Sequence, residues 1–268
     1  MTAAPAAAPL LVDPVDRPAA EPVAISVRGV HRVYGPRGNH VLALQDIDLD
    51  VARGEFVCLV GASGCGKSTL LTLLAGLEHP QGGTISVDGR VSLLFQDAAL
   101  FPWLTAAQNV QLALRLAGVP RREWADRVHQ LLSLVRLDGF GEKRPHELSG
   151  GMRQRTALAR ALAQVADVLL MDEPFGALDA MTRDILHDEL ERLWEQSGFT
   201  VIFVTHDVRE AVRLGDRVSV MTSRPGRIAE EFDIDLPRPR LAGDVEVGHL
   251  TDQITRRLRD EVGRHADD

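Results

Sequence analysis

A glycine-rich loop between an apolar segment and a leucine-rich segment constrains this chain more than any other feature. Residues 61–69 read Gly-Ala-Ser-Gly-Cys-Gly-Lys-Ser-Thr and match the pattern G-x-x-x-x-G-K-[ST] at every position. Residues 55–60 before the loop favour a β-strand, and residues 70–75 after it favour a helix. Glycines let successive backbone N–H groups turn inward, so this strand–loop–helix order is typical of a phosphate site at a helix N-terminus. We therefore expect phosphate groups to be bound by Gly61, Ala62, Ser63, Gly64, Cys65, Gly66, Lys67, Ser68 and Thr69.

Two residues of this loop have more specific expected roles. Lys67 would place a point charge against the β- and γ-phosphates of a nucleotide. The Ser68 hydroxyl would ligate Mg²⁺, which prefers oxygen ligands. A glycine-rich turn that matches by chance is the alternative, and the flanking strand and helix patterns argue against it.

The composition restricts the class of protein and its compartment. The chain has 268 residues, of which 45% are hydrophobic, so it is long enough for one or two domains with a core. Its net charge is −8 with acidic and basic residues interspersed, which argues against a protein that mainly binds nucleic acid. The two cysteines, Cys58 and Cys65, are expected to be unpaired thiols in a reducing compartment.

The sequence shows no segment for insertion into a membrane. No apolar run approaches the roughly 20 residues that span a bilayer. Residues 1–23 are rich in Ala and Pro and lack the basic start of a secretory signal, so we expect a disordered leader there. These features predict a cytoplasmic chain that does not cross a membrane by itself.

Hydrophobic periodicity predicts an α/β core that is interrupted by a helical segment. Residues 25–30 and 42–51 alternate apolar and polar side chains and, with a turn near residues 35–39, predict an antiparallel β-layer. From about residue 106 to 163 the apolar residues recur at helical spacing. The other expected elements are strands at 84–87, 168–171, 200–205, 218–221 and 227–232, helices at 180–197 and 244–262, and a proline-containing linker at 235–240.

A second sequence typical of an anion site lies within the helical segment. Residues 148–152 read Leu-Ser-Gly-Gly-Met and open a strongly helical stretch. Ser149 is placed to cap this helix, and Gly150 and Gly151 would expose their backbone amides. An ordinary helix cap is the alternative interpretation of these residues taken alone.

Together these motifs resemble the nucleotide-binding subunits of ATP-binding cassette (ABC) transporters, over about residues 25–240. The resemblance implies an α/β fold, with a P-loop NTPase core, an antiparallel β-layer and an inserted α-helical subdomain. It divides the chain into a leader at 1–23, an ABC ATPase domain at 24–240 with its helical subdomain at about 97–163, and a C-terminal helix and tail at 241–268.

The resemblance also assigns roles to residues outside the two loops, with ATP as the nucleotide and Mg²⁺ as its metal. Tyr34 would stack on the adenine ring. Gln96 would reach Mg²⁺ or the attacking water, and Asp172 would hold Mg²⁺ through water. Glu173 would polarise the attacking water as a general base, and His206 would contact the γ-phosphate and orient the water.

In this family the loop that carries Ser149, Gly150 and Gly151 closes on the γ-phosphate bound by a second subunit. One chain has one copy of each loop, so the resemblance implies a second ATP-binding subunit and favours a homodimer with two sites. Residues 176–179, Gly-Ala-Leu-Asp, match the family's loop that signals between the two sites.

Local sequences resemble the importer subfamily that serves nitrate, sulfonates, taurine and related small anions. These sequences lie at residues 95–104, with Pro102 and Trp103, and at residues 175–183, 223–228 and 237–240. The implied partners are an integral-membrane permease, contacted near residues 96–103 at the cytoplasmic face, and indirectly an extracytoplasmic solute-binding protein. No nucleic acid partner is implied.

Two other functions are consistent with the nucleotide motifs. A soluble ATPase of the same class could act on nucleic acid or ribosomes, but the chain has neither a long heptad pattern nor a second phosphate loop. The second alternative function is that of a regulatory protein whose ATP site is vestigial. The four charged or titratable residues of the expected site argue against it, since the sequence contains Lys67, Asp172, Glu173 and His206.

Overall fold

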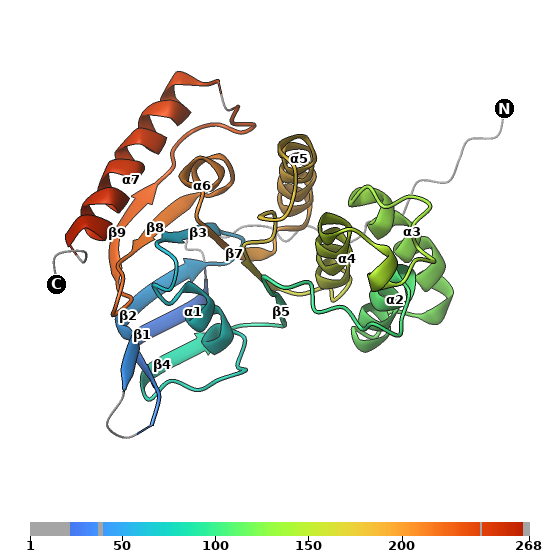
Figure 1. Ribbon diagram of the computed structural model, residues 1–268, viewed down its shortest axis with the longest axis horizontal. Helices are drawn as coiled ribbons and strands as arrows, with labels where there is room; N and C mark the ends of the chain where they lie inside the picture. The colour runs from blue at the N-terminus through green and yellow to red at the C-terminus, as the bar shows by residue number, and fades with distance from the viewer. Residues whose placement is uncertain (1–21, 37–39, 242, 265–268) are drawn as a thin grey trace.

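The computed structural model describes residues 22–36, 40–241 and 243–264. Apart from its last two residues, the leader expected at residues 1–23 lies outside this part, as do residues 37–39 of the expected turn. The described chain contains two β-sheets with a helix between them, and a group of helices at one end of the molecule (Figure 1). This arrangement confirms the expected α/β fold with an antiparallel layer and a helical insert.

The larger sheet has six strands in the described chain, and the first five in spatial order run parallel to one another. Short apolar runs form these strands because both faces of the sheet are covered. The last strand is antiparallel to its neighbour and closes the sheet. In spatial order the strands are β5 (Val91–Leu94), β6 (Val168–Asp172), β7 (Thr200–Thr205), β3 (Phe56–Gly61), β8 (Arg217–Met221) and β9 (Ile228–Asp233).

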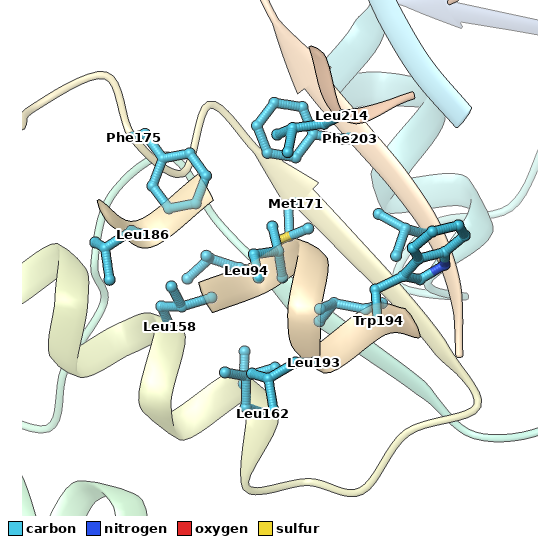
Figure 2. Close-up of a cluster of buried hydrophobic side chains, with 14 of the residues drawn as sticks. Leu94, Leu158, Leu162, Met171, Phe175, Leu186, Leu193, Trp194, Phe203 and Leu214 are labelled. Carbon is cyan, nitrogen blue, oxygen red and sulfur yellow. The ribbon is translucent and has the colours of Figure 1, made fainter. Parts of the chain in front are cut away.

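Alternate residues of the central strands enter two different hydrophobic cores. Phe203 of β7 and Met171 of β6 belong to the core that contains the helices of the insert and helix α5 (Ala180–Ser197). Ile202 and Leu170, one position earlier in each strand, belong to the core under the antiparallel sheet. Side chains alternate faces along a strand, so a continuous apolar run fills both cores at once. Figure 2 shows part of the first core, with Leu94, Leu158, Leu162, Met171, Phe175, Leu186, Leu193, Trp194, Phe203 and Leu214.

The smaller sheet is antiparallel and lies across α1 from the larger one. It consists of β1 (Val23–Tyr34), β2 (Val41–Ala52) and β4 (Gly82–Val87), in the order β2-β1-β4. Helix α1 (Lys67–Leu74) contributes four leucines to the core between the two sheets. The first turn of α1 is therefore fixed by packing on both sides, which holds the phosphate loop in place.

The helical insert consists of α2 (Ala106–Leu116), α3 (Trp124–Leu134) and α4 (Gly150–Leu162), with short 3₁₀ turns between them. Thr105 and Gln108 form a capping box at the start of α2. The second half of α4 packs into the core beside α5, through residues that include Leu158 and Leu162 (Figure 2). The insert is thus joined to the α/β core mainly by α4.

Three helices complete the chain: α5 (Ala180–Ser197), α6 (Val208–Leu214) and α7 (Val245–Arg264). The amphipathic pattern predicts α7, and the structure places it over α6, with Val247 and Ile254 buried (Figure 1). Within the described residues no helix is both long enough and apolar enough to cross a membrane.

The expected linker at residues 235–240 has no regular secondary structure, but it is not a free spacer. Arg240 is only 3% exposed and donates hydrogen bonds to four backbone carbonyl groups, among them those of Val212 and Ile234. Burial and the neighbouring Arg238 lower the pKa of Arg240 to about 10. The guanidinium of Arg238 lies 4.5 Å from the ring centre of Trp194. This segment therefore anchors the C-terminal part of the chain to the core.

Candidate functional site

The predicted chemical groups follow consecutive strands of the parallel sheet. The phosphate loop follows β3, Asp172 ends β6 with Glu173 directly after it, and His206 follows β7. The register pairs Asp172 with Val204 and Val60 with Thr205, so the carboxyl ends of these strands lie level. Because ligands of open parallel sheets bind at the carboxyl ends of the strands, this edge is the candidate site.

Close packing at the phosphate loop requires glycine at both ends. Gly66 has a φ of 101°, and a Cβ atom there would lie 2.6 Å from Leu44 Cδ2. A Cβ atom at Gly61 would lie 2.7 Å from the Cys65 sulfur and 2.9 Å from the backbone oxygen of Met221. All three contacts are shorter than real Cβ atoms show, so other residues would displace the loop or its neighbours.

Lys67 turns back over the loop that precedes it. Its ammonium donates to the carbonyl oxygens of Gly61 at 2.8 Å and Ala62 at 2.9 Å, and the side chain is 6% exposed. No side chain caps α1, because its N-cap residue is Gly66. A helix start that lacks a side-chain cap and has a lysine beside it suits a phosphate group.

Asp172 lies at the end of β6 beside the first turn of α1. It is 8% exposed, and burial raises the pKa of its carboxyl group. A hydrogen bond from the Ser68 side chain opposes this shift of the pKa, as does the charge of Lys67. The structure therefore brings together the Ser68 hydroxyl and the Asp172 carboxylate, two of the three side chains that the sequence assigns to Mg²⁺.

Glu173 and His206 form a pair at the open side of this edge. Glu173 Oε2 lies 3.1 Å from His206 Nδ1, and the Glu173 backbone N–H donates to the carbonyl oxygen of Val204 at 3.0 Å. The φ of Glu173 is 45°, a left-handed conformation that is costly outside glycine. The His206 side chain is 67% exposed, so the pair can contact a water molecule.

The second loop lies apart from this edge, at the start of α4. Ser149 caps α4 by accepting a hydrogen bond from the Met152 backbone N–H at 3.2 Å, as the sequence predicts. Ser149 and Gly150 are exposed, and within the described chain the hydrogen bonds of Ser149 stay inside α4. A Cβ atom at Gly151 would lie 3.1 Å from Leu178 Cδ2, so the loop at residues 176–179 packs against the start of α4.

Comparisons with known proteins agree with this geometry. The sequence pattern of the family described as ABC transporter matches residues 44–176. The nitrate import ATP-binding protein NrtD of Synechocystis sp. is 48% identical over 221 residues, which cover 80% of this chain and 83% of that protein. The aliphatic sulfonates import ATP-binding protein SsuB of Bacillus cereus is 43% identical, over 81% of this chain and 88% of that protein.

The chain belongs to the ABC transporter family. Its fold also matches a dimeric, post-hydrolysis structure of an ATP-binding cassette bound to ADP and Pi, with a TM-score of 0.73 and 31% identity. That match covers 80% of this chain and all of the other. The protein is therefore an ABC-type ATPase, a class of protein that binds ATP.

Tyr34 is the last residue of β1 and pairs with Val41 of β2, three positions before Leu44, which lies against Gly66 of the phosphate loop. The Tyr34 hydroxyl donates to Glu78 Oε2 at 2.6 Å, and the guanidinium of Arg32 lies 4.7 Å from the Tyr34 ring centre. The stacking of adenine on Tyr34 remains a prediction.

Gln96 follows β5 and is exposed, at the start of a segment attached to the insert of the cassette. Gln154 of α4 donates to the Phe95 carbonyl oxygen at 3.5 Å. Arg160 of α4 donates to the carbonyl oxygens of Ala98 and Ala99, at 3.1 and 2.7 Å. The segment therefore connects the edge of the sheet to α4, and a metal contact of Gln96 remains a prediction.

Sequence reasoning missed one group of polar residues behind the site. His187 of α5 and Glu210 of α6 are both buried, and His187 Nε2 lies 2.6 Å from Glu210 Oε1. The only sequence signal is that each polar residue occupies a position on the apolar face of its helix. Such a signal does not show that the two residues meet, because it carries no information on how α5 and α6 pack.

Proposed function

We propose that this chain is the ATP-hydrolysing subunit of an importer for a small anion such as nitrate, a sulfonate or taurine. The observation that carries the proposal is the alignment of Lys67, Asp172, Glu173 and His206 at one edge of the sheet. The import of an anion is supported by relatives whose names describe nitrate and aliphatic sulfonate import.

The strand-end edge offers ligands for a magnesium nucleotide. Ser68 would hold Mg²⁺ directly, and Asp172 would hold it through a water molecule. Gln96 would reach Mg²⁺ or the attacking water. The bound ion would neutralise charge on the phosphates. Glu173 would accept a proton from the attacking water, and His206 would orient that water through its contact with Glu173.

A second copy of the chain would complete the site. Ser149 and Gly150 are exposed and Gly151 is half-buried at the start of α4, and the hydrogen bonds of Ser149 in the described chain stay within that helix. The backbone amides of these residues suit the γ-phosphate held by a partner, as the match to a dimeric cassette supports. Two identical chains in a head-to-tail pair would then bind two ATP molecules between them.

A groove beside the insert is the proposed contact for the permease, which would hold the protein at the cytoplasmic face of the membrane. The groove has a volume of about 550 Å³ and lies between β5, α2 and α4. Phe95, Phe101 and Leu116 line it and are exposed. Trp103 is 67% exposed, with its ring centre 5.5 Å from that of Phe101. Exposed aromatic side chains around an apolar groove are typical of a protein interface.

Purification from native membranes tests this function. Tagged Glu173→Gln chain, which should retain ATP, would be isolated from detergent-solubilised membranes with Mg·ATP, and its companions identified. We expect a multi-span permease together with a solute receptor, whose ligand then identifies the cargo. The same purification without nucleotide is the control. Recovery of a soluble, ribosomal or nucleic acid partner without a permease would overturn the importer and favour the soluble ATPase.

A further inference from the structure

A buried polar chain lies behind the exposed pair of Glu173 and His206. His187 is 3% exposed and Glu210 is 8% exposed, and their side chains meet at 2.6 Å. The edge of the Phe175 ring covers His187, with the ring centres 5.0 Å apart. Phe175 itself lies in the hydrophobic core (Figure 2). The pair is thus enclosed by apolar side chains on the inner side of the site.

The other oxygen of this carboxylate reaches the turn that carries His206. Glu210 Oε2 accepts a hydrogen bond from the Thr205 hydroxyl. The same hydroxyl oxygen accepts a hydrogen bond from the Asp207 backbone N–H at 3.0 Å. Thr205 thus bonds the buried carboxylate directly, and Asp207 is linked to it through the Thr205 hydroxyl. The turn between them, which carries His206, has little freedom.

Such an arrangement is costly if it serves packing alone. Removing a carboxylate from water is unfavourable unless its oxygens find donors, and an apolar residue of similar size would fill the same space. Here both oxygens of Glu210 have partners, and both partners come from elements next to reacting groups. The Nδ1 atom of His187 is buried and has no hydrogen-bond partner in the described part of the chain, so the imidazole is held through Nε2 alone.

The chain of contacts also leads to the loop expected to face a second subunit. His187 belongs to α5, which begins at Ala180 directly after the loop at residues 176–179. Leu178 in that loop lies close to Gly151 at the start of α4. A shift of this loop would therefore move α5, and with it the imidazole that meets Glu210.

We propose that His187 and Glu210 are positioning residues for ATP hydrolysis, which act through Thr205 to hold His206 against Glu173. The inference rests on the proposed roles of Glu173 and His206. It deepens that function by naming the buried groups that set the geometry of the pair. A displacement of about 1 Å at a reacting group can cost roughly 100-fold in rate. A loose turn at His206 should therefore lower kcat and leave the binding of ATP intact.

Variants of nearly constant shape separate positioning from folding. Thr205→Val removes the hydroxyl, Thr205→Ser restores it, and Glu210→Gln removes the charge. In the full-length chain we expect Thr205→Val and Glu210→Gln to lower kcat by about 10- to 100-fold with KM within about twofold. Thr205→Ser should recover kcat to within about threefold of the unaltered chain.

Arg213→Gln is the matched control on the same two helices. Arg213 of α6 forms ion pairs with Asp184 and Asp188 of α5, at 2.8 and 2.7 Å, and within the described residues these side-chain contacts do not reach the His206 turn. If loosening α5 against α6 were sufficient to lower the rate, Arg213→Gln would lower kcat as Thr205→Val does. We expect its kcat to be unchanged and its thermal midpoint slightly lower.

A second readout does not depend on turnover. In histidine-labelled protein the ¹H–¹³C ring signal of His206, assigned with His206→Ala, should move or broaden in Thr205→Val and Glu210→Gln and stay unchanged in Arg213→Gln. Unchanged ring signals together with unchanged kcat in both test variants would overturn the inference. If His206→Ala itself keeps full activity, the proposed catalytic site is wrong. If His206→Ala is inactive while Thr205→Val is fully active, only the positioning role fails.

Discussion

The strand-end edge of the large sheet and the start of α4 both resemble phosphate sites, yet their surroundings differ. At the edge, Lys67 and Asp172 are more than nine-tenths buried and are held by hydrogen bonds within the core. At the start of α4, Ser149 and Gly150 are exposed, and Ser149 bonds only within its own helix in the described chain. The edge holds its charged side chains against the core, whereas the start of α4 is an exposed surface.

The comparison shows how one chain can carry parts of two different sites. Groups that react must be fixed against the core, because a static environment stabilises charge better than a mobile one. Groups that close on a ligand from outside must stay accessible until the partner surface arrives. The predictions below test whether this division between the two regions is real.

The largest expected effect belongs to Glu173 at the edge. Glu173→Gln keeps the size of the side chain but removes the base, so kcat should fall by about 10²- to 10⁴-fold. Binding of ATP should be retained because Lys67 and the glycine loop are unaltered. Hydrolysis assays and equilibrium binding of a fluorescent ATP analogue measure the two effects. Turnover at the rate of the unaltered chain would contradict the general-base role.

Mixing two inactive variants tests whether the regions belong to different sites. Lys67→Met damages the edge and Gly150→Asp places a negative charge in the α4 loop, where a Cβ atom has open space apart from Arg153 Nη2 at 3.9 Å. Each variant alone should lose about 100-fold or more in rate. If the regions pair between chains, an equal mixture should form mixed dimers with one intact site and recover about a quarter of the normal rate.

The same mixture has an outcome that rejects the comparison. If the α4 loop served the phosphate loop of its own chain, both chains of a mixed dimer would carry a damaged site. The mixture would then recover no activity. A double variant that carries Lys67→Met and Gly150→Asp in one chain, mixed with the unaltered chain, is the control. If each site is built from two chains, a dimer of the double variant with an unaltered chain has one damaged loop in both of its sites. This control therefore shows what subunit exchange does to the rate when no complementation is possible.

The two regions also differ in how well the sequence predicts them. The edge could be predicted in detail because the apolar runs at 168–171 and 200–205 and the motif at 61–69 each define a strand end. The expected helix at 180–197 has the bounds of α5. The order β5-β6-β7-β3-β8-β9 could not be predicted from these patterns, because strand pairing depends on contacts between distant residues.

Other features lay beyond sequence patterns for identifiable reasons. Strand β5 and helix α6 were not predicted, and for α6 the reason is that seven residues are too short to show a helical period. The burial of Arg240 was hidden by the prolines around it, which are typical of exposed linkers. The left-handed backbone of Glu173 also has no signal in the sequence, since the residue is not glycine.

The exposed rim of the insert should contribute to partner binding and not to stability. Trp103→Ala removes a large apolar side chain, and loss of such an interface residue typically costs about 2 kcal/mol or more, which is roughly 30-fold in affinity. Co-purification of the permease should fall accordingly. Val245→Ala, a change at a residue 71% exposed at the start of α7, is the control and should leave the complex intact. An unchanged yield with Trp103→Ala would remove this rim from the contact.

The smallest expected effect separates the two roles of Ser149. Ser149→Ala removes the N-cap of α4 and should cost about 1 kcal/mol in the free energy of unfolding, measured by denaturant titration. Thr105→Ala is the matched control, because Thr105 caps the neighbouring helix α2 with the same geometry. Both variants should lose similar stability, whereas only Ser149→Ala should also weaken ATP-dependent dimer formation in analytical ultracentrifugation. If both variants dimerise equally well, the Ser149 hydroxyl is a helix cap and the loop closes on its partner through backbone amides alone.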